Sequence, residues 1–554
     1  MKINSEKQIS KIKLPKYFWI GSVISGVLLG LNPPGFGTHW LGLISFLPLV
    51  FTLEEFHGIK DLSIRKRALM YFGICWLSGA IAASIGGYWI TNSIHVFGHV
   101  PWFAALILTG IGYGLEVGFQ LFIYFGIPLL VIRKLNNWDL PLRLAFVLAL
   151  DPWYPRLIHW NYGALTFSEF PLLEQLADLI GSSGLILYSA GLAFLLLGWW
   201  RWKTSRILRL KTLLKATIIY LLLWGLGLSY GAWRLYNLET QDLEPNPQSS
   251  YLTVLVIQPN FSLQDLTSNP ELAHSKRQQN LESLLNDSRK ALANLPQNTA
   301  IPKMLIWPES VYPDPFFKVA ESREKVTAFA RKHQTSILLA TVDWKHTNSG
   351  TKFHGVSVLV GADGKVLGRY NKIFLIPFGE TIPFSGLFPG VASWLRKNIA
   401  NMSEFAQGQE YTVFPLSETN QLSAPICFDI FNPEVLRGMV RNGSKLVVNL
   451  SNLAWFGRTT ASDNMVAVLR WRAIENRVPV VFASNNGESV VIGANGKNMS
   501  QQLGLFEEGA LSSRLLLQSQ FSFYREYAEW VWSGYLFIFF MLLIQAHFRG
   551  KIFQ

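Results

Sequence analysis

Eight apolar runs constrain this chain more than any other feature of its sequence. They span about 17–31, 40–53, 69–91, 101–132, 142–158, 179–200, 212–236 and 529–548. Several reach the roughly 20 residues that an α-helix needs to cross a bilayer, whereas the second and fifth are short or interrupted by proline. We therefore predict a multi-pass α-helical membrane domain over residues 1–240, with about seven transmembrane helices, and a C-terminal transmembrane helix at 529–548.

The composition agrees with a chain that lies partly in lipid. Of its 554 residues, 50% are hydrophobic and only 15% are charged. A water-soluble surface needs more charge than that, and the length exceeds what one hydrophobic core normally serves. A formal net charge of +13 is compatible with a nucleic-acid partner. The basic residues are concentrated in particular loops, however, so we expect a membrane partner and no nucleic acid.

Lysine and arginine fall on one side of the predicted membrane domain. If the N-terminus is cytoplasmic, the loops on that side and the C-terminal tail carry Lys60, Arg65, Lys66, Arg67, Arg133, Lys134, Arg143, Arg201, Lys203, Arg206, Arg209, Lys211, Lys215, Arg549 and Lys551. The opposite loops around 32–39 and 92–100 carry neither residue type, and the third carries only Arg156. The positive-inside rule then predicts cytoplasmic N- and C-termini and places residues 245–520 outside the cytoplasm, facing a periplasm. The first run lacks a small-x-small cleavage site and is predicted to stay as a helix.

The chain changes character between residues 245 and 520. After a polar linker at 245–250, strand patterns alternate with helical ones. The predicted strands are 251–258, 303–307, 336–342, 355–360, 422–428, 446–450, 478–484 and 489–492, and the predicted helices are 271–294, 318–333, 433–442 and 464–476. Repeated strand–helix units indicate an α/β domain.

The two cysteines, Cys75 and Cys427, lie far apart in very different surroundings. They do not form a disulfide framework, and no Cys/His spacing predicts a zinc site. We therefore expect no metal and no cofactor. Cys427 ends an apolar stretch within Ala424–Phe431, so it is either a nucleophile or a small buried core residue.

Two other reactive side chains lie near predicted strand ends. Glu309 follows a strand and Pro308, which cannot extend a ladder, so its carboxylate is expected at the strand mouth. Lys372 is followed by Ile373 and Phe374 and is expected to be poorly solvated for a surface lysine. Glu380, in a Pro-Phe-Gly-Glu turn, is a second candidate carboxylate. Each alone has an ordinary alternative: a loop-entry acid, or a lysine whose stem packs on apolar surface.

Together these residues support acyl chemistry at Cys427. A thiol near its usual pKa is only a few per cent thiolate at neutral pH and needs a base or a nearby cation. Glu309 can supply the base and Lys372 the cation. An ammonium group can also stabilise the oxyanion that forms when a thiolate attacks a carbonyl.

The motif order WPES, YNK-x-FLIPFGE, ICFD and NLSN-x-AWFG resembles the nitrilase superfamily with its Glu-Lys-Cys triad. A nitrilase-like domain between seven helices and one closing helix is similar to the apolipoprotein N-acyltransferase family of the bacterial inner membrane. The resemblance implies an α/β nitrilase-like αββα sandwich domain. It also implies Glu309 as general base, Lys372 as oxyanion stabiliser, Cys427 as nucleophile and Glu380 as a supporting acid.

Three positions depart from the pattern of that family. Phe428 stands where Tyr is usual, Asp429 where Glu is usual, and Leu453 where Asp is expected. The triad itself is intact, so acyl chemistry is expected to persist. Phe428 and Asp429 are expected to influence which acyl acceptor is used, and how efficiently.

The resemblance implies transfer of an acyl chain from a phospholipid, through a cysteine thioester, to the N-terminal amine of a diacylglyceryl apolipoprotein. The apolar segment 382–395, which contains Trp394, is expected to be a lid on the lipid surface, the alternative being a loop packed on its own domain. Two other functions stay open. One is a membrane-tethered nitrilase-type amidase or hydrolase with water as acceptor. The other is a non-catalytic envelope scaffold, in which the triad residues have no reason to meet.

Overall fold

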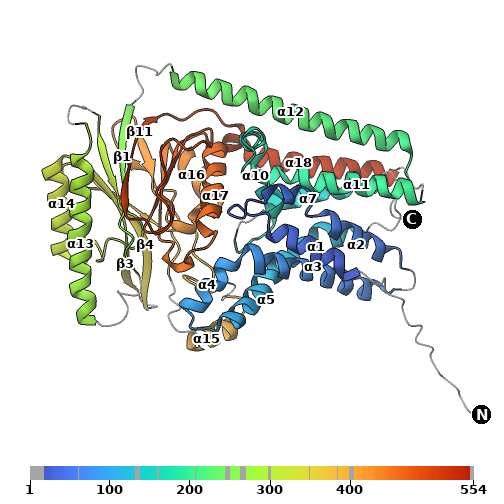
Figure 1. Ribbon diagram of the computed structural model, residues 1–554, viewed down its shortest axis with the longest axis horizontal. Coiled ribbons are helices and arrows are strands. Elements are labelled where there is room, and N and C mark those ends of the chain that lie inside the picture. The colour runs from blue at the N-terminus through green and yellow to red at the C-terminus, as the bar shows by residue number, and fades with distance from the viewer. Residues whose placement is uncertain are drawn as a thin grey trace, which may run out of the picture.

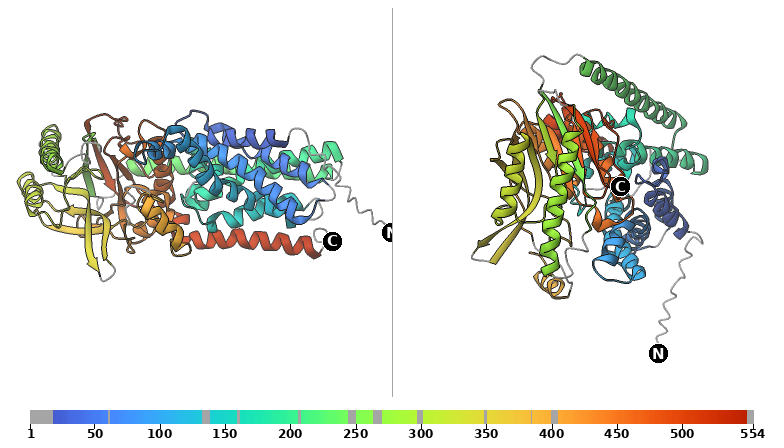
Figure 2. Two further views of the ribbon diagram at one scale, coloured as in Figure 1. Left: turned by 90° about the horizontal axis from the view of Figure 1, so that it is seen from below. Right: turned by 60° about the vertical axis from the view of Figure 1, so that its left-hand side comes forward.

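A computed structural model describes residues 18–59, 62–131, 138–158, 161–205, 208–243, 250–262, 270–296, 301–347, 350–383, 385–398 and 405–548. Most of the linker predicted at 245–250 lies outside these ranges. Figures 1 and 2 show a bundle of long helices at one end of the molecule and an α/β domain at the other.

The helical half is built from segments of very different length. Its elements are α1 (Phe18–Gly30), η1 (His39–Ile44), α2 (Leu47–His57), α3 (Ile64–Gly86), α4 (Tyr88–Val96), α5 (Trp102–Leu121), η2 (Phe122–Gly126), α6 (Ile127–Val131), α7 (Asp139–Leu150), η3 (Asp151–Trp153), α8 (Tyr162–Leu165), α9 (Pro171–Glu174), α10 (Ala177–Gly184), α11 (Ile186–Ser205), α12 (Leu210–Leu243) and the C-terminal α18 (Phe523–Phe548). The last of these returns to the bundle after the α/β domain (Figure 1).

Within the described residues, four helices are long and apolar enough to cross a membrane: Ile64–Gly86, Trp102–Val131, Leu210–Leu238 and Phe523–Phe548. A fifth span is possible if α10 and α11, bent by 60°, count as one. The other three predicted runs correspond to shorter helices, α1, α2 and α7, of 13, 11 and 12 residues. The expected count of eight spans therefore stays a prediction.

Small residues let two of the long helices approach closely. A Cβ atom on Gly79 of α3 would lie 2.3 Å from the backbone nitrogen of Gly118 in α5, and one on Gly114 would lie 2.5 Å from the Cα of Ala80. Glycine at such a crossing allows backbone contact, a common way for helices to associate in lipid. A larger side chain at Gly79 would separate α3 from α5.

The α/β domain contains two sheets. Its elements are β1 (Ser250–Gln258), α13 (Pro270–Ala293), β2 (Lys303–Ile306), α14 (Ala320–His333), β3 (Ser336–Thr347), β4 (Gly350–Val360), β5 (Val366–Asn371), α15 (Pro389–Asn398), β6 (Phe414–Pro415), β7 (Gln421–Ser423), η5 (Cys427–Phe431), α16 (Pro433–Arg441), β8 (Ser444–Ser451), η6 (Ala454–Phe456), α17 (Ala461–Asn476), β9 (Val480–Ser484), β10 (Val490–Ile492) and β11 (Gly509–Leu517). One sheet has the order β11-β1-β2-β3-β4-β5 and the other β10-β9-β8-β7-β6.

The two sheets pack face to face between two pairs of helices, with α13 and α14 on one side and α16 and α17 on the other (Figure 1). Strand β1 shows why. Val254 and Val256 belong to the core between the sheets, whereas Leu255 and Ile257 belong to the core under α13 and α14. Alternate residues of a strand point to opposite faces, so an apolar strand can serve two cores. The predicted αββα sandwich is confirmed.

One predicted strand ends earlier than expected. Leu422–Phe428 was expected as a strand, but β7 ends at Ser423. Pro425 has no N–H to donate to a ladder, and beyond it only Ile426 bridges Leu450. Cys427 then begins the short helix η5. The cysteine therefore lies on a tight turn at the end of the strand.

Candidate active site

Glu309 lies where the first sheet ends. Trp307 continues β2 by donating its N–H to Leu338 O at 2.8 Å, and Pro308 then stops the ladder. The following Ser310 has a left-handed φ of 64°. The turn directs the Glu309 carboxylate toward the second sheet, where its Oε2 accepts a hydrogen bond from the backbone N–H of Asn452 at 3.1 Å.

Lys372 follows β5 and is almost completely buried, at 1% exposure. Its backbone is held on both sides, because its N–H donates to Gly355 O and its carbonyl accepts from Gly408 N. Its Nζ lies 2.8 Å from Glu380 Oε1 and 3.7 Å from Glu309 Oε1. One ammonium therefore serves two carboxylates.

Glu380 is itself fixed by the turn that carries it. Its Oε2 accepts the backbone N–H of Ile376 at 2.9 Å, and its own N–H donates to Ile376 O at 2.9 Å. With one oxygen tied to the turn and the other to Lys372, the carboxylate holds the ammonium in place. A charge-assisted bond of this kind is among the stronger protein hydrogen bonds.

Cys427 begins η5 with a left-handed φ of 48° and is 1% exposed. Its carbonyl accepts a hydrogen bond from Asn449 Nδ2 at 3.2 Å, and its thiol lies close enough to the Glu309 carboxylate for the two groups to interact electrostatically. A non-glycine residue in this region of φ costs energy and persists only where the surroundings impose it. The turn places Cys427 beside Glu309.

Burial, together with the charges inside this cluster, accounts for its pKa shifts. Burial raises the pKa of Glu309 to about 7; Lys372 opposes the shift and Glu380 adds to it. Burial and the neighbouring Glu309 raise the pKa of the Cys427 thiol. Burial alone would lower the pKa of Lys372, but Glu380 and Glu309 outweigh it and the pKa rises. A carboxyl with a pKa near neutrality, next to a thiol, is suited to act as a general base.

Asp429 joins the cysteine turn to the lysine segment. It is fully buried, and its carboxylate accepts hydrogen bonds from four groups: Ile373 N at 3.2 Å, Phe374 N at 2.7 Å, Ile426 N at 2.9 Å and Tyr370 Oη at 2.8 Å. Burial raises its pKa to about 6, against the effect of Lys372 and the backbone donors. Asp429 therefore ties the segment after β5 to the turn that carries Cys427.

Phe428 points to an aromatic cluster that spans both halves of the molecule. Its ring centroid lies 6.2 Å from Trp89 of α4, 4.9 Å from Phe431 and 6.0 Å from Phe456. Leu453, the third departure from the family pattern, is buried beside Gly487. The residue after the cysteine thus contacts the helical half directly.

Sequence reasoning did not single out three residues of this site. Asn452 was visible within the motif NLSN-x-AWFG, and Tyr370 within YNK, but nothing marked them as partners of Glu309 and Asp429. Trp89 lies 338 positions before Cys427 in the numbering, and no local pattern connects it to the cysteine. Only the packing of α4 against the turn does so.

Trp394 lies on α15. Its side chain is 61% exposed, and Leu387 and Phe388 in the same segment are 74% and 60% exposed. Phe384, expected as part of the same lid, lies outside the described residues. Within the described ranges, no group of three or more His, Cys, Asp or Glu side chains is arranged to hold a metal ion.

Comparisons with known proteins match both halves of the chain. Residues 270–520 match the carbon-nitrogen hydrolase family, and residues 25–195 match the apolipoprotein N-acyltransferase N-terminal domain. The chain belongs to the apolipoprotein N-acyltransferase family. With its apolar helices, this makes it a membrane protein.

Two relatives are similar to this chain along nearly its whole length. The chain is 28% identical over 535 residues to the apolipoprotein N-acyltransferase of Geobacter metallireducens, covering 93% of this chain and 92% of that protein. It is 26% identical over 562 residues to that of Bdellovibrio bacteriovorus, covering 95% and 93%. Among solved structures, Saccharomyces cerevisiae Nit3, a nitrilase-superfamily member, matches 48% of this chain and 90% of its own with 17% identity and a TM-score of 0.36.

Proposed function

We propose that this protein transfers an acyl chain from a phospholipid, through a thioester on Cys427, to the α-amine of a diacylglyceryl-cysteine at an apolipoprotein N-terminus. Family membership supports the reaction class. The observation that carries the mechanism is the meeting of Glu309, Lys372 and Cys427, with Lys372 Nζ 3.7 Å from Glu309 Oε1 and the thiol in electrostatic contact with both groups.

In the first step Glu309 takes the proton of the Cys427 thiol, and the sulfur attacks the carbonyl of the sn-1 ester. The ammonium of Lys372 stabilises the oxyanion that forms. The bond between carbonyl carbon and glycerol oxygen then breaks, and Glu309 returns its proton to the leaving alkoxide. The products are a lysophospholipid and an acyl thioester on Cys427.

In the second step the free α-amine of the apolipoprotein attacks the thioester. Glu309 accepts a proton from the amine as the carbon–nitrogen bond forms, and the carbon–sulfur bond breaks. The thiol is regained when the proton returns from Glu309 to sulfur. The lysophospholipid leaves before the acceptor reacts, so ping-pong kinetics are expected.

Both substrates are lipids, which suits a catalytic domain beside a bilayer. The proposed location is the bacterial inner membrane, with both termini cytoplasmic and the catalytic domain periplasmic. The one-sided distribution of Lys and Arg in the loops supports this orientation.

The segment around Leu387, Phe388 and Trp394 is proposed to admit acyl chains from the outer leaflet. These side chains are exposed and apolar and follow Glu380 directly in sequence. Leu387→Asp and Trp394→Asp should slow acylation from phospholipid vesicles while leaving the thermal unfolding midpoint within about 2 °C, as expected for surface changes. Unchanged turnover in both variants would show that this segment does not admit acyl chains.

The direct test uses a phospholipid labelled in its sn-1 acyl chain. Wild-type protein should gain the mass of one acyl chain, and adding a diacylglyceryl-cysteine peptide should move the label to the peptide amine. Cys427→Ala should form no acyl-enzyme and should fail to complement a strain that lacks N-terminal lipoprotein acylation. Label that appears as free fatty acid in the presence of the peptide would instead identify a hydrolase.

A further inference from the structure

Helix α10 is broken close to the catalytic domain. Gly181 has φ 70° and ψ 161°, which is not helical, and α10 and α11 are bent by 60°. In a continuous helix Ser182 N would donate to Asp178 O, four residues earlier. At the break the two groups have other partners: Ser182 N donates to Glu475 Oε1 at 2.8 Å, and Asp178 O accepts from Ser522 Oγ at 3.3 Å.

Glu475 extends this contact into the catalytic domain. It lies on α17 and is 1% exposed. Its other carboxylate oxygen pairs with Arg472, one turn earlier on the same helix. Arg472 Nε then donates to Ile430 O at 2.9 Å. Ile430 belongs to η5, the short helix that begins at Cys427.

A continuous chain of hydrogen bonds therefore runs from the helix break to the turn that carries the nucleophile. Arg472 is 3% exposed and Ile430 is fully buried. The planar guanidinium can donate to a carboxylate and a carbonyl at once in fixed directions, which a lysine ammonium on a flexible stem does less well. Water cannot easily substitute for these bonds at such burial, so their geometry should hold.

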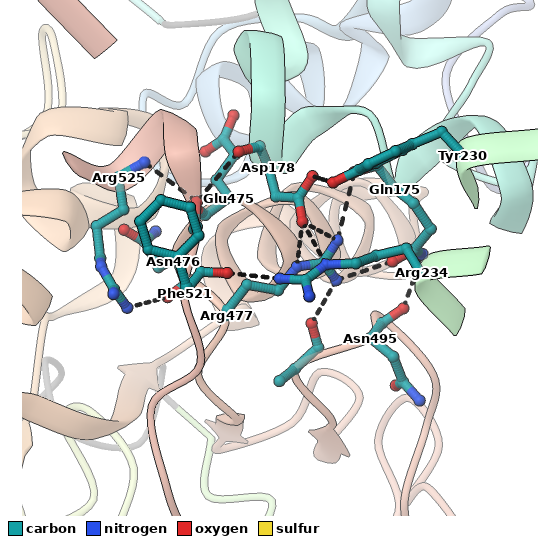
Figure 3. Close-up of polar contacts among 12 residues, drawn as sticks. Gln175, Asp178, Tyr230, Arg234, Glu475, Asn476, Arg477, Asn495, Phe521 and Arg525 are labelled. Carbon is teal, nitrogen blue, oxygen red and sulfur yellow. Dashed lines mark hydrogen bonds and ion pairs between the residues drawn. The ribbon is translucent and has the colours of Figure 1, made fainter. Parts of the chain in front are cut away.

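A neighbouring set of bonds offers a built-in control. Figure 3 shows Arg477 and Arg234 on either side of Asp178 of α10. Arg477 Nη2 and Arg234 Nε lie 2.6 and 2.8 Å from Asp178 Oδ2, and Tyr230 Oη donates to Oδ1 at 2.6 Å. Arg477 also donates to Gln175 Oε1 at 2.8 Å. These contacts join α10, α12 and the catalytic domain, and none of them involves η5.

We propose that Arg472 is a positioning residue for acyl transfer. Together with Glu475 it couples the position of the Cys427 turn to the broken helix of the membrane half, so the thiol is aligned with Glu309 when the two halves are docked. The proposal rests on the proposed function for its acyl-transfer readout. Misplacing a reacting group by about 1 Å can cost on the order of a hundredfold in rate.

The test compares Arg472→Lys with the matched control Arg477→Lys in the full-length protein. The first readout is the rate of acyl-thioester formation at saturating labelled phospholipid. The second is the rate at which iodoacetamide alkylates Cys427, located by peptide mapping, because this needs no acyl donor. We expect Arg472→Lys to slow both rates about tenfold or more with little change in KM, consistent with misalignment of the thiol. Arg477→Lys should leave both within about twofold at a similar loss of thermal stability.

Each outcome decides the question. Equal slowing in both variants, or wild-type rates in Arg472→Lys, would overturn the positioning role and leave Arg472 as an ordinary interface residue. If Arg472→Lys does not accumulate in the membrane, Glu475→Gln replaces it, since an amide keeps an acceptor for Ser182 N but loses the charged pair with Arg472. Slower alkylation in a protein whose wild type forms no acyl thioester would support the coupling and contradict the proposed function instead.

Discussion

Two buried ionic clusters, one in each half of the molecule, differ in their balance of charge. In the helical half, the carboxylates of Glu54 and Asp139 meet the guanidinium groups of Arg143 and Arg201, two negative charges with two positive ones. Arg201 Nε lies 2.6 Å from Glu54 Oε1, and Arg201 Nη1 lies 2.8 Å from Asp139 Oδ2. Arg143 Nη1 lies 3.3 Å from Glu54 Oε2.

In the catalytic half, Glu309 and Glu380 share the single ammonium of Lys372. Burial, with a smaller contribution from the neighbouring Glu380 carboxylate, raises the pKa of Glu309 to about 7, so this group can hold a proton near neutrality. A buried cluster with balanced charges can therefore serve as a structural clamp, whereas one with an excess of carboxylates keeps a proton that can move. This is how burial and like charge commonly create a catalytic base.

Removing the only cation of the unbalanced cluster should have the largest effect. Lys372→Met leaves two partly buried carboxylates side by side and removes the proposed stabiliser of the oxyanion, so thioester formation should fall about 10³-fold. The measurement is the rate of label transfer to Cys427 in a single turnover. Lys365→Met is the control, because Lys365 is exposed and pairs only with Asp363 at the surface. A loss of less than tenfold would show that the ammonium is not needed at the oxyanion.

Breaking the balanced cluster should affect stability and leave catalysis intact. Arg201→Met leaves Arg143 as the one guanidinium of this cluster for two buried carboxylates and should lower the free energy of unfolding by about 3–5 kcal/mol. The check is thermal unfolding in detergent, together with kcat of the folded protein, which should stay within about twofold. Lys203→Met is the control, because Lys203 is exposed on α11, two residues after Arg201. It should change neither the free energy of unfolding nor kcat. A large fall in kcat without loss of stability would show that the cluster of the helical half also acts in catalysis.

Glu309→Gln should lower activity and, above pH 7, raise the stability of the folded protein. Acyl-enzyme formation should fall about 10²-fold with the loss of the general base. The pKa of Glu309 is about 7 in the folded protein against 4.5 for the free side chain, so folded protein binds the proton more tightly. Stability contributed by this group is then present below the unfolded pKa and is lost as pH rises toward 7. Above pH 7 the Gln variant should be more stable than wild type by roughly 1–3 kcal/mol.

The pH profile offers a finer comparison. Wild-type activity should fall about tenfold per pH unit below roughly pH 7, as Glu309 takes up a proton. Glu380→Gln removes the like charge that raises the pKa of Glu309, and should move this acidic limb to lower pH by roughly one unit. The profile is measured as kcat/KM against pH. An unmoved limb would mean that Glu380 does not act on the base.

The smallest effect is expected at Phe428, which contacts the aromatic cluster and no charged group described above. Phe428→Tyr should leave thioester formation unchanged and alter transfer to the amine by about fivefold or less, the worth of one net hydrogen bond. The two steps are measured separately, with and without the acceptor peptide. A change confined to thioester formation would show that Phe428 influences the nucleophile and not the use of the acceptor.

Much of the architecture could be read from local patterns. The apolar runs indicated a helical membrane half because lipid admits little else, and the alternation of strands and helices indicated the α/β domain. The order of four motifs pointed to Glu309, Lys372 and Cys427, since each follows or ends an apolar segment. Some boundaries differ from those predicted: β7 ends at Ser423, before Pro425, and a 60° bend divides one long apolar run into α10 and α11.

Local patterns were therefore enough for the two halves, their order and the chemical identity of the reactive groups, because periodicity and residue type are properties of short segments. What depends on tertiary structure is how charge and position are shared between distant segments. The extra carboxylate beside Lys372, the four donors around Asp429 and the path from Ser182 through Arg472 to the Cys427 turn join residues up to 293 positions apart. Such partners meet only when the chain packs, since burial and docking, and no spacing along the sequence, bring them within hydrogen-bond distance.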